Sequence, residues 1–230
     1  TILTSRSQAT PFISELVAVG NDSFQDEDGD TPDWLEIHNP TNETINLGGY
    51  HLTDDAVALE KWTFPEVNLP PGEYLVVFAS DKNRATAGSE LHTNFKLSGS
   101  GEYLALIAPD GTTITNQFSP TFPVQATGFS YGVEGTAADG SRGYFDPPSP
   151  GTENSTLLSA PLVAPVISPA SGTFTSNVKV AITPAFAGGV IRYTTNGSNP
   201  TSSSPLYPGP LTLTSTTHLR ARVFDPGTNG

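Results

Sequence analysis

The chain has 230 residues, a formal net charge of −13 and no cysteine, which excludes disulfides, thiolate metal sites and cysteine nucleophiles. The excess of Asp and Glu disfavours binding to nucleic-acid phosphates, and no apolar stretch is long enough to span a membrane. With 22 Gly and 21 Pro, many short strands joined by turns are expected rather than long helices. The sequence begins at Thr1 and contains no Met, so we interpret it as a piece of a longer product.

Three segments of the first half predict strands. Residues 12–18 are largely apolar, and residues 33–39 alternate, with Leu35 and Ile37 on one face. Residues 72–79 are apolar on both faces, which is typical of a central strand that is covered on two sides.

A hairpin is predicted where residues 102–107 and 112–115 flank Pro109, Asp110 and Gly111. An Asp-Gly pair tolerates positive φ and closes tight turns between antiparallel strands. Short strands at this spacing, without a long helical stripe, favour a β-sandwich over an α/β fold.

A series of motifs runs through residues 10–154, in the order FISEL at 12–16, DWLEIHNP at 33–40, INLGGYHLTD at 45–54, LPPGEY at 69–74, LHTNFKL at 91–97, GEYLAL at 101–106 and PSPGTEN at 148–154. In this order the motifs resemble those of the bacterial lamin tail domain. The resemblance implies an immunoglobulin-like sandwich. Bacterial members of that family are modules of large secreted or surface-attached proteins, and they have no assigned catalytic residues.

The remainder of the chain has a different character. Residues 1–153 contain 22 acidic and 6 basic residues, whereas residues 154–230 contain one acidic and four basic residues. Residues 176–182 and 218–224 alternate and predict half-buried strands, the second with its two arginines outward. ISPASGTF at 167–174 and IRYTTNGSNPT at 191–201 are similar to the chitobiase/β-hexosaminidase C-terminal domain, which implies a fibronectin type III-like sandwich.

This second region departs from the family pattern in two details. Asn196-Gly197 stands where the family usually has Asp-Gly, and either pair favours a tight hairpin turn. The family usually has one more strand than the sequence up to Gly230 provides, so this domain is expected to be truncated or completed from elsewhere.

The predicted organisation is therefore all-β, with two immunoglobulin-like or fibronectin-like sandwiches in tandem. We expect the lamin-tail-like domain at 1–154, a proline-punctuated linker at 155–164 and the fibronectin-like domain at 165–230.

The strongest candidate site is an acidic loop ahead of the second strand. Its candidate ligands are Asp26, Asp28, Asp30, Asp33 and Glu36. Closely spaced carboxylates beside a glycine suit Ca²⁺, although the spacing differs from that of an EF-hand. The alternative interpretation is a solvated loop whose charge keeps a strand edge from pairing with other chains.

Other chemistry finds little support in the pattern. The four histidines have no metal-ligand spacing, and no Gly-x-Ser-x-Gly elbow occurs, so we predict that the chain is not an enzyme. The expected function is a noncatalytic, extracellular or cell-surface module for spacing and interaction, with other domains of the same protein or surface proteins as partners. The alternative is a polysaccharide-binding module that targets an attached hydrolase, with aromatic side chains such as Trp34 and Trp62 as a platform for sugar rings.

Overall fold

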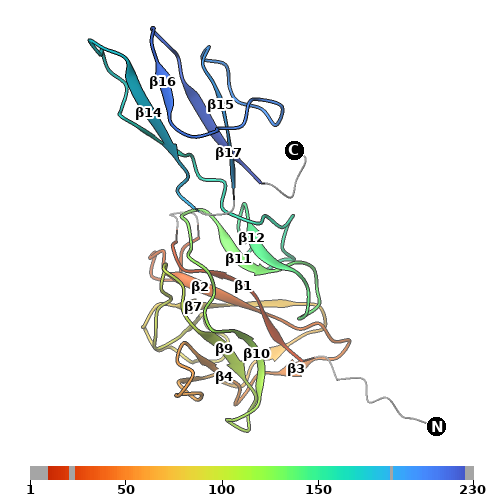
Figure 1. Cartoon of the computed structure of the whole chain (residues 1–230). Coiled ribbons are helices and arrows are strands. Elements are labelled where there is room, and N and C mark those ends of the chain that lie inside the picture. Colours follow the sequence, from red (N-terminus) through yellow and green to blue (C-terminus); the bar gives the residue numbers. More distant parts are fainter. Residues whose placement is uncertain (1–9, 21–23, 187–188, 226–230) are drawn as a thin grey trace, which may run out of the picture. The chain divides into compact units, whose positions relative to one another are not determined.

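A computed structural model describes residues 10–20, 24–186 and 189–225 of the chain. Within these ranges the regular elements are all strands, and no helix long and apolar enough to cross a membrane occurs among them (Figure 1). The chain divides after Leu157 into two compact units, and each unit has its own sheets.

The first unit contains a six-stranded sheet in which only β7 and β8 run parallel, while the other neighbours are antiparallel. Its strands, in sheet order, are β12 (Arg142–Phe145), β11 (Ser130–Val133), β1 (Phe12–Val17), β2 (Asp33–His38), β7 (Tyr74–Ala79) and β8 (Leu91–His92).

A four-stranded sheet forms the second layer of this unit. Its strands, in sheet order, are β10 (Ile114–Phe118), β9 (Leu104–Ile107), β4 (His51–Thr53) and β5 (Trp62–Thr63). Beside it, β3 (Ile45–Asn46) pairs with β6 (Asn68–Leu69).

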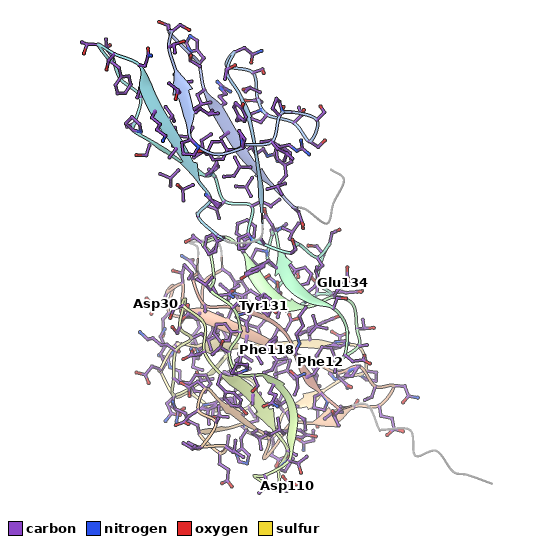
Figure 2. The ribbon with its side chains drawn as sticks, in the orientation of Figure 1. Phe12, Asp30, Asp110, Phe118, Tyr131 and Glu134 are labelled. Atoms are coloured by element: carbon purple, nitrogen blue, oxygen red, sulfur yellow. The ribbon has the colours of Figure 1, made fainter. Side chains whose placement is uncertain are left out.

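Both sheets contribute to one apolar interior. Leu35 and Ile37 of β2 are fully buried in the same hydrophobic cluster as Leu104 of β9. Phe118 and Tyr131 lie inside the unit in Figure 2, with their ring centroids 5.8 Å apart in an edge-to-face arrangement. Two sheets that share an apolar interior form a sandwich, and the predicted all-β class is confirmed.

The predicted strands at 33–39 and 72–79 are confirmed as β2 and β7, which pair along their whole length. The second face of β2 is covered as well. Trp34 packs with Val17 and Phe78 in a second hydrophobic cluster, and Glu36 is fully buried beneath residues 146–154. These nine residues, which follow β12, are called the strap below.

The predicted hairpin is also confirmed, since β9 and β10 pair antiparallel across Asp110 and Gly111. Only Gly111 of the two takes a positive φ, 71°. The Asp110 carboxylate instead accepts hydrogen bonds from the amides of Thr112 and Thr113, at 2.9 and 2.7 Å. The turn is therefore fixed by glycine conformation together with a side-chain cap.

The second unit has a three-stranded sheet and a separate antiparallel pair of strands. The sheet consists of β13 (Val166–Ser168), β14 (Val178–Thr183) and β16 (Leu211–Leu213), and the pair consists of β15 (Val190–Thr194) and β17 (Arg220–Phe224). Val180 and Ile182 of β14 and Val223 of β17 are its buried apolar side chains on strands, while both arginines of β17 are exposed, as their alternation predicted.

The tight hairpin turn predicted at Asn196-Gly197 is wrong. Residues 191–193 do pair with residues 205–207, but a long loop joins them, and the principal partner of β15 is β17. Gly197 takes a φ of 82° and donates its amide to the carbonyl of His218. Asn196 accepts from the amide of Ser198 at 3.0 Å, so the local turn caps the loop instead of closing a hairpin.

Candidate functional site

The acidic loop folds around the carboxylate of Asp26. One oxygen of this carboxylate accepts hydrogen bonds from the amides of Asp28 and Asp30, both at 3.0 Å. Gly29, with a φ of 83°, donates its amide to the carbonyl of Asp26 and allows the reversal. As a result, the carboxylates of Asp26, Asp28 and Asp30 offer oxygens that all lie within 4.8 Å of one another.

The cation at the centre of this cluster is the ammonium group of Lys82. Its Nζ lies 2.6 Å from Asp26, 2.6 Å from Asp28 and 2.8 Å from Asp30. Although desolvation lowers the pKa of Lys82, its hydrogen bonds to the three carboxylates raise it well above the usual value. The three acids therefore share an internal, permanently charged partner.

Arg84 adds a second positive charge at the rim of the cluster. Its guanidinium contacts Asp28 at 2.8 Å and Glu27 at 2.7 Å. The hydrogen bond from Arg84 and then that from Lys82 lower the pKa of Asp28 to about 2. Asp30 is the most exposed of the three acids, and Figure 2 shows it on the outside of the first unit.

The structure brings together three of the five predicted ligands. Asp33 lies outside the cluster and accepts a hydrogen bond from the amide of Leu97 at 3.3 Å, while burial raises its pKa to about 6. Glu36 points beneath the strap and binds Ser14 and Gly151. The five-residue set is corrected to Asp26, Asp28 and Asp30, because the extended strand β2 carries Asp33 and Glu36 away from the loop. Calcium binding itself stays a prediction.

A second carboxylate site, which sequence reasoning missed, lies on the outer face of the six-stranded sheet. Glu15 of β1 and Glu36 of β2 are cross-strand neighbours, and both are fully buried. A register shift between Ile13 and Glu15 brings them opposite each other. The signal in the sequence is an acid within each of two otherwise mostly apolar strand segments, together with the PSPGTEN motif at 148–154.

Hydrogen-bond donors surround this pair. Glu15 accepts from the hydroxyls of Ser130 and Ser149 and from the amide of Ser149. Burial nevertheless raises the pKa of Glu15. Burial, with a further contribution from the charge of Glu15, raises the pKa of Glu36 to about 8, despite hydrogen bonds from Ser14 and Gly151 that act in the opposite direction.

A serine–histidine contact adjoins the acidic cluster. The Oγ of Ser80 lies 2.9 Å from Nδ1 of His92, and Nε2 of His92 is 3.9 Å from Glu27. The last distance is too long for a hydrogen bond, and the Oγ of Ser80 already accepts from the amide of Lys82. His92 is also fully buried, so a substrate would not reach this pair without movement of the surrounding chain.

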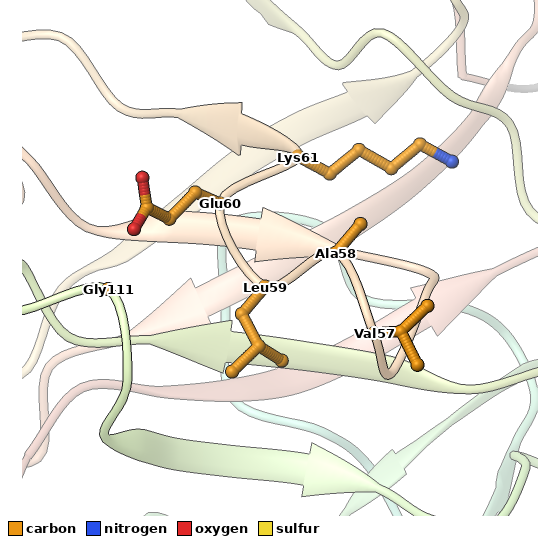
Figure 3. Close-up of a pocket in the computed structure, with 6 residues that line it drawn as sticks. All are labelled: Val57, Ala58, Leu59, Glu60, Lys61 and Gly111. Carbon is orange, nitrogen blue, oxygen red and sulfur yellow. The ribbon is translucent and has the colours of Figure 1, made fainter.

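A surface hollow and the two tryptophans are the other features of the first unit that could form a site. A shallow hollow of about 470 Å³ lies between residues 57–61 and Gly111, and in Figure 3 the side chains of Glu60 and Lys61 point in opposite directions. Lys61 pairs with Asp54 at 2.5 Å. Trp34 and Trp62 are each 3% exposed, so they do not form an exposed platform for sugar rings.

Two family models match the chain. The model of the Lamin Tail Domain matches residues 4–121, and the model of the Chitobiase/beta-hexosaminidase C-terminal domain matches residues 169–230. Both are immunoglobulin-like domains, and both resemblances inferred from the motifs are confirmed in that order. No curated protein and no solved structure matches the chain.

Proposed function

Since the chain belongs to the Lamin Tail Domain family, we propose that it is a noncatalytic interaction and spacer module of a larger secreted or cell-surface protein. The observation that carries this proposal is the division after Leu157 into two units with separate sheets. Successive immunoglobulin-like units extend a chain stepwise and hold neighbouring domains apart. The division falls inside the proline-punctuated segment 155–164, whose residues from 158 on belong to the second unit, where Ser159 donates hydrogen bonds to Asp225.

The polar clusters support a structural use of the acidic residues. Lys82 binds three carboxylates of the acidic loop from within, and the strap covers Glu15 and Glu36. These carboxylates hold one part of the fold to another. Partners would then be other domains of the same protein or surface proteins. Because the first unit is acidic, it would contact basic surfaces on these partners.

The spacer role is tested by pulling the intact chain from its two ends in a single-molecule force experiment. Two independent unfolding steps are expected, with contour-length gains of roughly 500 Å and roughly 230 Å at about 3.5 Å per residue. The chain contains no cysteine, so handles attached through introduced terminal cysteines give one defined geometry. A single cooperative step for the whole chain would contradict the proposal.

The noncatalytic part is tested on glycosides, esters, peptides and phosphodiesters. Turnover that disappears in Ser80→Ala or His92→Asn, but not in the exposed control Ser203→Ala, would contradict the proposal and assign chemistry to the serine–histidine contact. Sedimentation with insoluble polysaccharides tests the alternative of carbohydrate binding. The spacer proposal expects no retention by the polysaccharide.

A further inference from the structure

We propose that the strap is a pH-sensitive latch, which stays closed while the Glu15–Glu36 pair retains a proton and opens when that proton is lost. The latch consists of two neighbouring carboxylates on β1 and β2 and of the segment 146–154 that lies over them.

The strap is attached to the pair through its backbone. The amide of Gly151 donates to one oxygen of Glu36 at 2.5 Å, and the amide of Ser149 donates to both oxygens of Glu15, at 3.1 and 3.2 Å. Asn154 closes the end of the strap by donating to the carbonyls of Ser14 and Val133, at 2.9 and 2.8 Å. The attachment therefore depends on both carboxyl groups remaining in place.

The hydrogen-bond geometry accommodates a proton on Glu36. The Oγ of Ser14 lies 2.7 Å from Oε1 of Glu36 and 3.3 Å from the Glu36 carbonyl oxygen. A protonated Glu36 can donate to this hydroxyl, which in turn donates to the carbonyl, while Oε2 still accepts from Gly151. The closed state is thus fully hydrogen-bonded with one proton on the pair.

Loss of that proton leaves two negative charges side by side in a buried place. Beside the pair, Tyr74 of β7 interacts with Glu36, and Glu153 of the strap interacts with both Tyr74 and His38 of β2. Burial first, and then the charges of Glu153 and Glu36, raise the pKa of Tyr74 to about 12. Among the described residues no salt bridge reaches either glutamate. A buried like-charge pair without a compensating cation is costly, and lifting the strap admits water to both groups.

Opening has a consequence for the chain as a tether. The strap ends three residues before the division after Leu157, so its release adds nine residues to the short segment that precedes the second unit. At about 3.3–3.6 Å per residue, this lengthens the reach of that segment by roughly 30 Å. The spacer would be shorter in acid and longer in alkali.

Hydrogen exchange of the Ser149 and Gly151 amides in the intact chain tests the latch, with each rate divided by its intrinsic rate at that pH. Protection of both amides is expected to fall at least tenfold between pH 6 and pH 9.5, while the amide of Leu35 in β2 stays protected. In Glu36→Gln the neutral amide keeps the acceptor for Gly151 and donates to Ser14, so the strap should stay protected at both pH values. The exposed Glu43→Gln serves as the matched control and should behave like the parent.

Equal protection of the strap at pH 6 and pH 9.5 in the parent would overturn the proposal. The same fall in Glu36→Gln as in the parent would also overturn it. A carboxyl carbon titration of the unmodified chain by NMR does not depend on any variant folding. If both Glu15 and Glu36 titrate with midpoints below pH 5, the pair holds no proton to lose and the latch is refuted.

Discussion

The ammonium of Lys82 lies 2.6 Å from the carboxylate of Asp26, a residue 56 positions earlier in the chain. The Asp26 side chain is fully buried, whereas Lys82 keeps a fifth of its side-chain surface exposed. Asp81 and Asn83, on either side of Lys82, take positive φ values of 66° and 52°. Backbone strain of this kind is retained only where the surroundings demand it, and here it presents the lysine to the acidic loop.

Replacing Lys82 with Met should lower the melting temperature by several degrees, because three carboxylates then repel one another around an unpaired buried acid. A loss of even about 1 kcal/mol lowers the melting temperature of a domain of 150–250 residues by about 2–4 °C. Thermal unfolding followed by circular dichroism measures the effect. Lys179→Met, at an exposed position on β14, is the control, and an equal shift in both variants would show that Lys82 has no special role.

If calcium binds the folded state, it raises the free energy of unfolding by about 2.7 kcal/mol when its concentration is a hundred times the dissociation constant. The melting temperature should then rise with calcium. Since the Lys82 ammonium occupies the centre of the cluster, the calcium shift should be small in the parent and larger in Lys82→Met. Melting in calcium, magnesium and chelator gives the comparison, with Asp28→Asn combined with Asp30→Asn as the ligand-deficient variant. If the melting temperature of each variant is the same in calcium, magnesium and chelator, the loop does not bind calcium and acts only as a charged surface that protects a strand edge.

The contribution of Glu36 and Asp33 to stability should be largest on the acid side, near pH 4–5, whereas the buried His38 and His92, whose pKa values burial lowers, act in the opposite direction below about pH 6.5. Burial raises the pKa of Glu36 from 4.5 to about 8 and that of Asp33 from 3.8 to about 6. Between the lower and the higher value of each group the folded state binds more protons than the unfolded state, so the free energy of unfolding falls as the pH rises through that interval. The pKa of Asp28, lowered to about 2 mainly by Arg84, costs stability only as the pH falls below about 4. Urea unfolding from pH 3 to pH 9 tests this order. Glu36→Gln should flatten the decline above pH 5, and a stability maximum near pH 8 in the parent would be incompatible with these shifts.

Two glycines separate backbone strain from steric crowding. Gly101 and Gly88 take similar positive φ values, 89° and 83°, but a Cβ on Gly101 would lie 2.2 Å from the carbonyl oxygen of Phe122, and one on Gly88 would meet nothing within 4 Å. Gly88→Ala should cost about 1–2 kcal/mol from φ alone. Gly101→Ala should cost about 2–5 kcal/mol, because the backbone around Phe122 must also move. If chemical denaturation gives the same loss in free energy of unfolding for both variants, the backbone around Phe122 moves aside at little cost.

Secondary structure that is determined by residues close together in the sequence was predictable. The alternation of Leu35 and Ile37 fixed strand β2 because side chains on a strand point to opposite faces with a period of two. Asp110-Gly111 fixed a hairpin for an equally local reason, the positive φ of glycine and the short reach of Asp. The same local rule failed at Asn196-Gly197, where pairing between β15 and β17 decided the course of the chain.

Composition, periodicity and motif order therefore determined by themselves the all-β class, both family resemblances and the convergence of Asp26, Asp28 and Asp30, which are close in the chain. Only the tertiary structure decided which cation meets those acids and which carboxylates are buried together. Lys82 reaches Asp26 across 56 positions, and the strap reaches Glu15 across 134. Such contacts depend on the order of strands in the sheet and on a register shift between β1 and β2. Neither can be read from the sequence pattern of one strand, because the free energy of strand pairing is summed over all residue pairs of both strands.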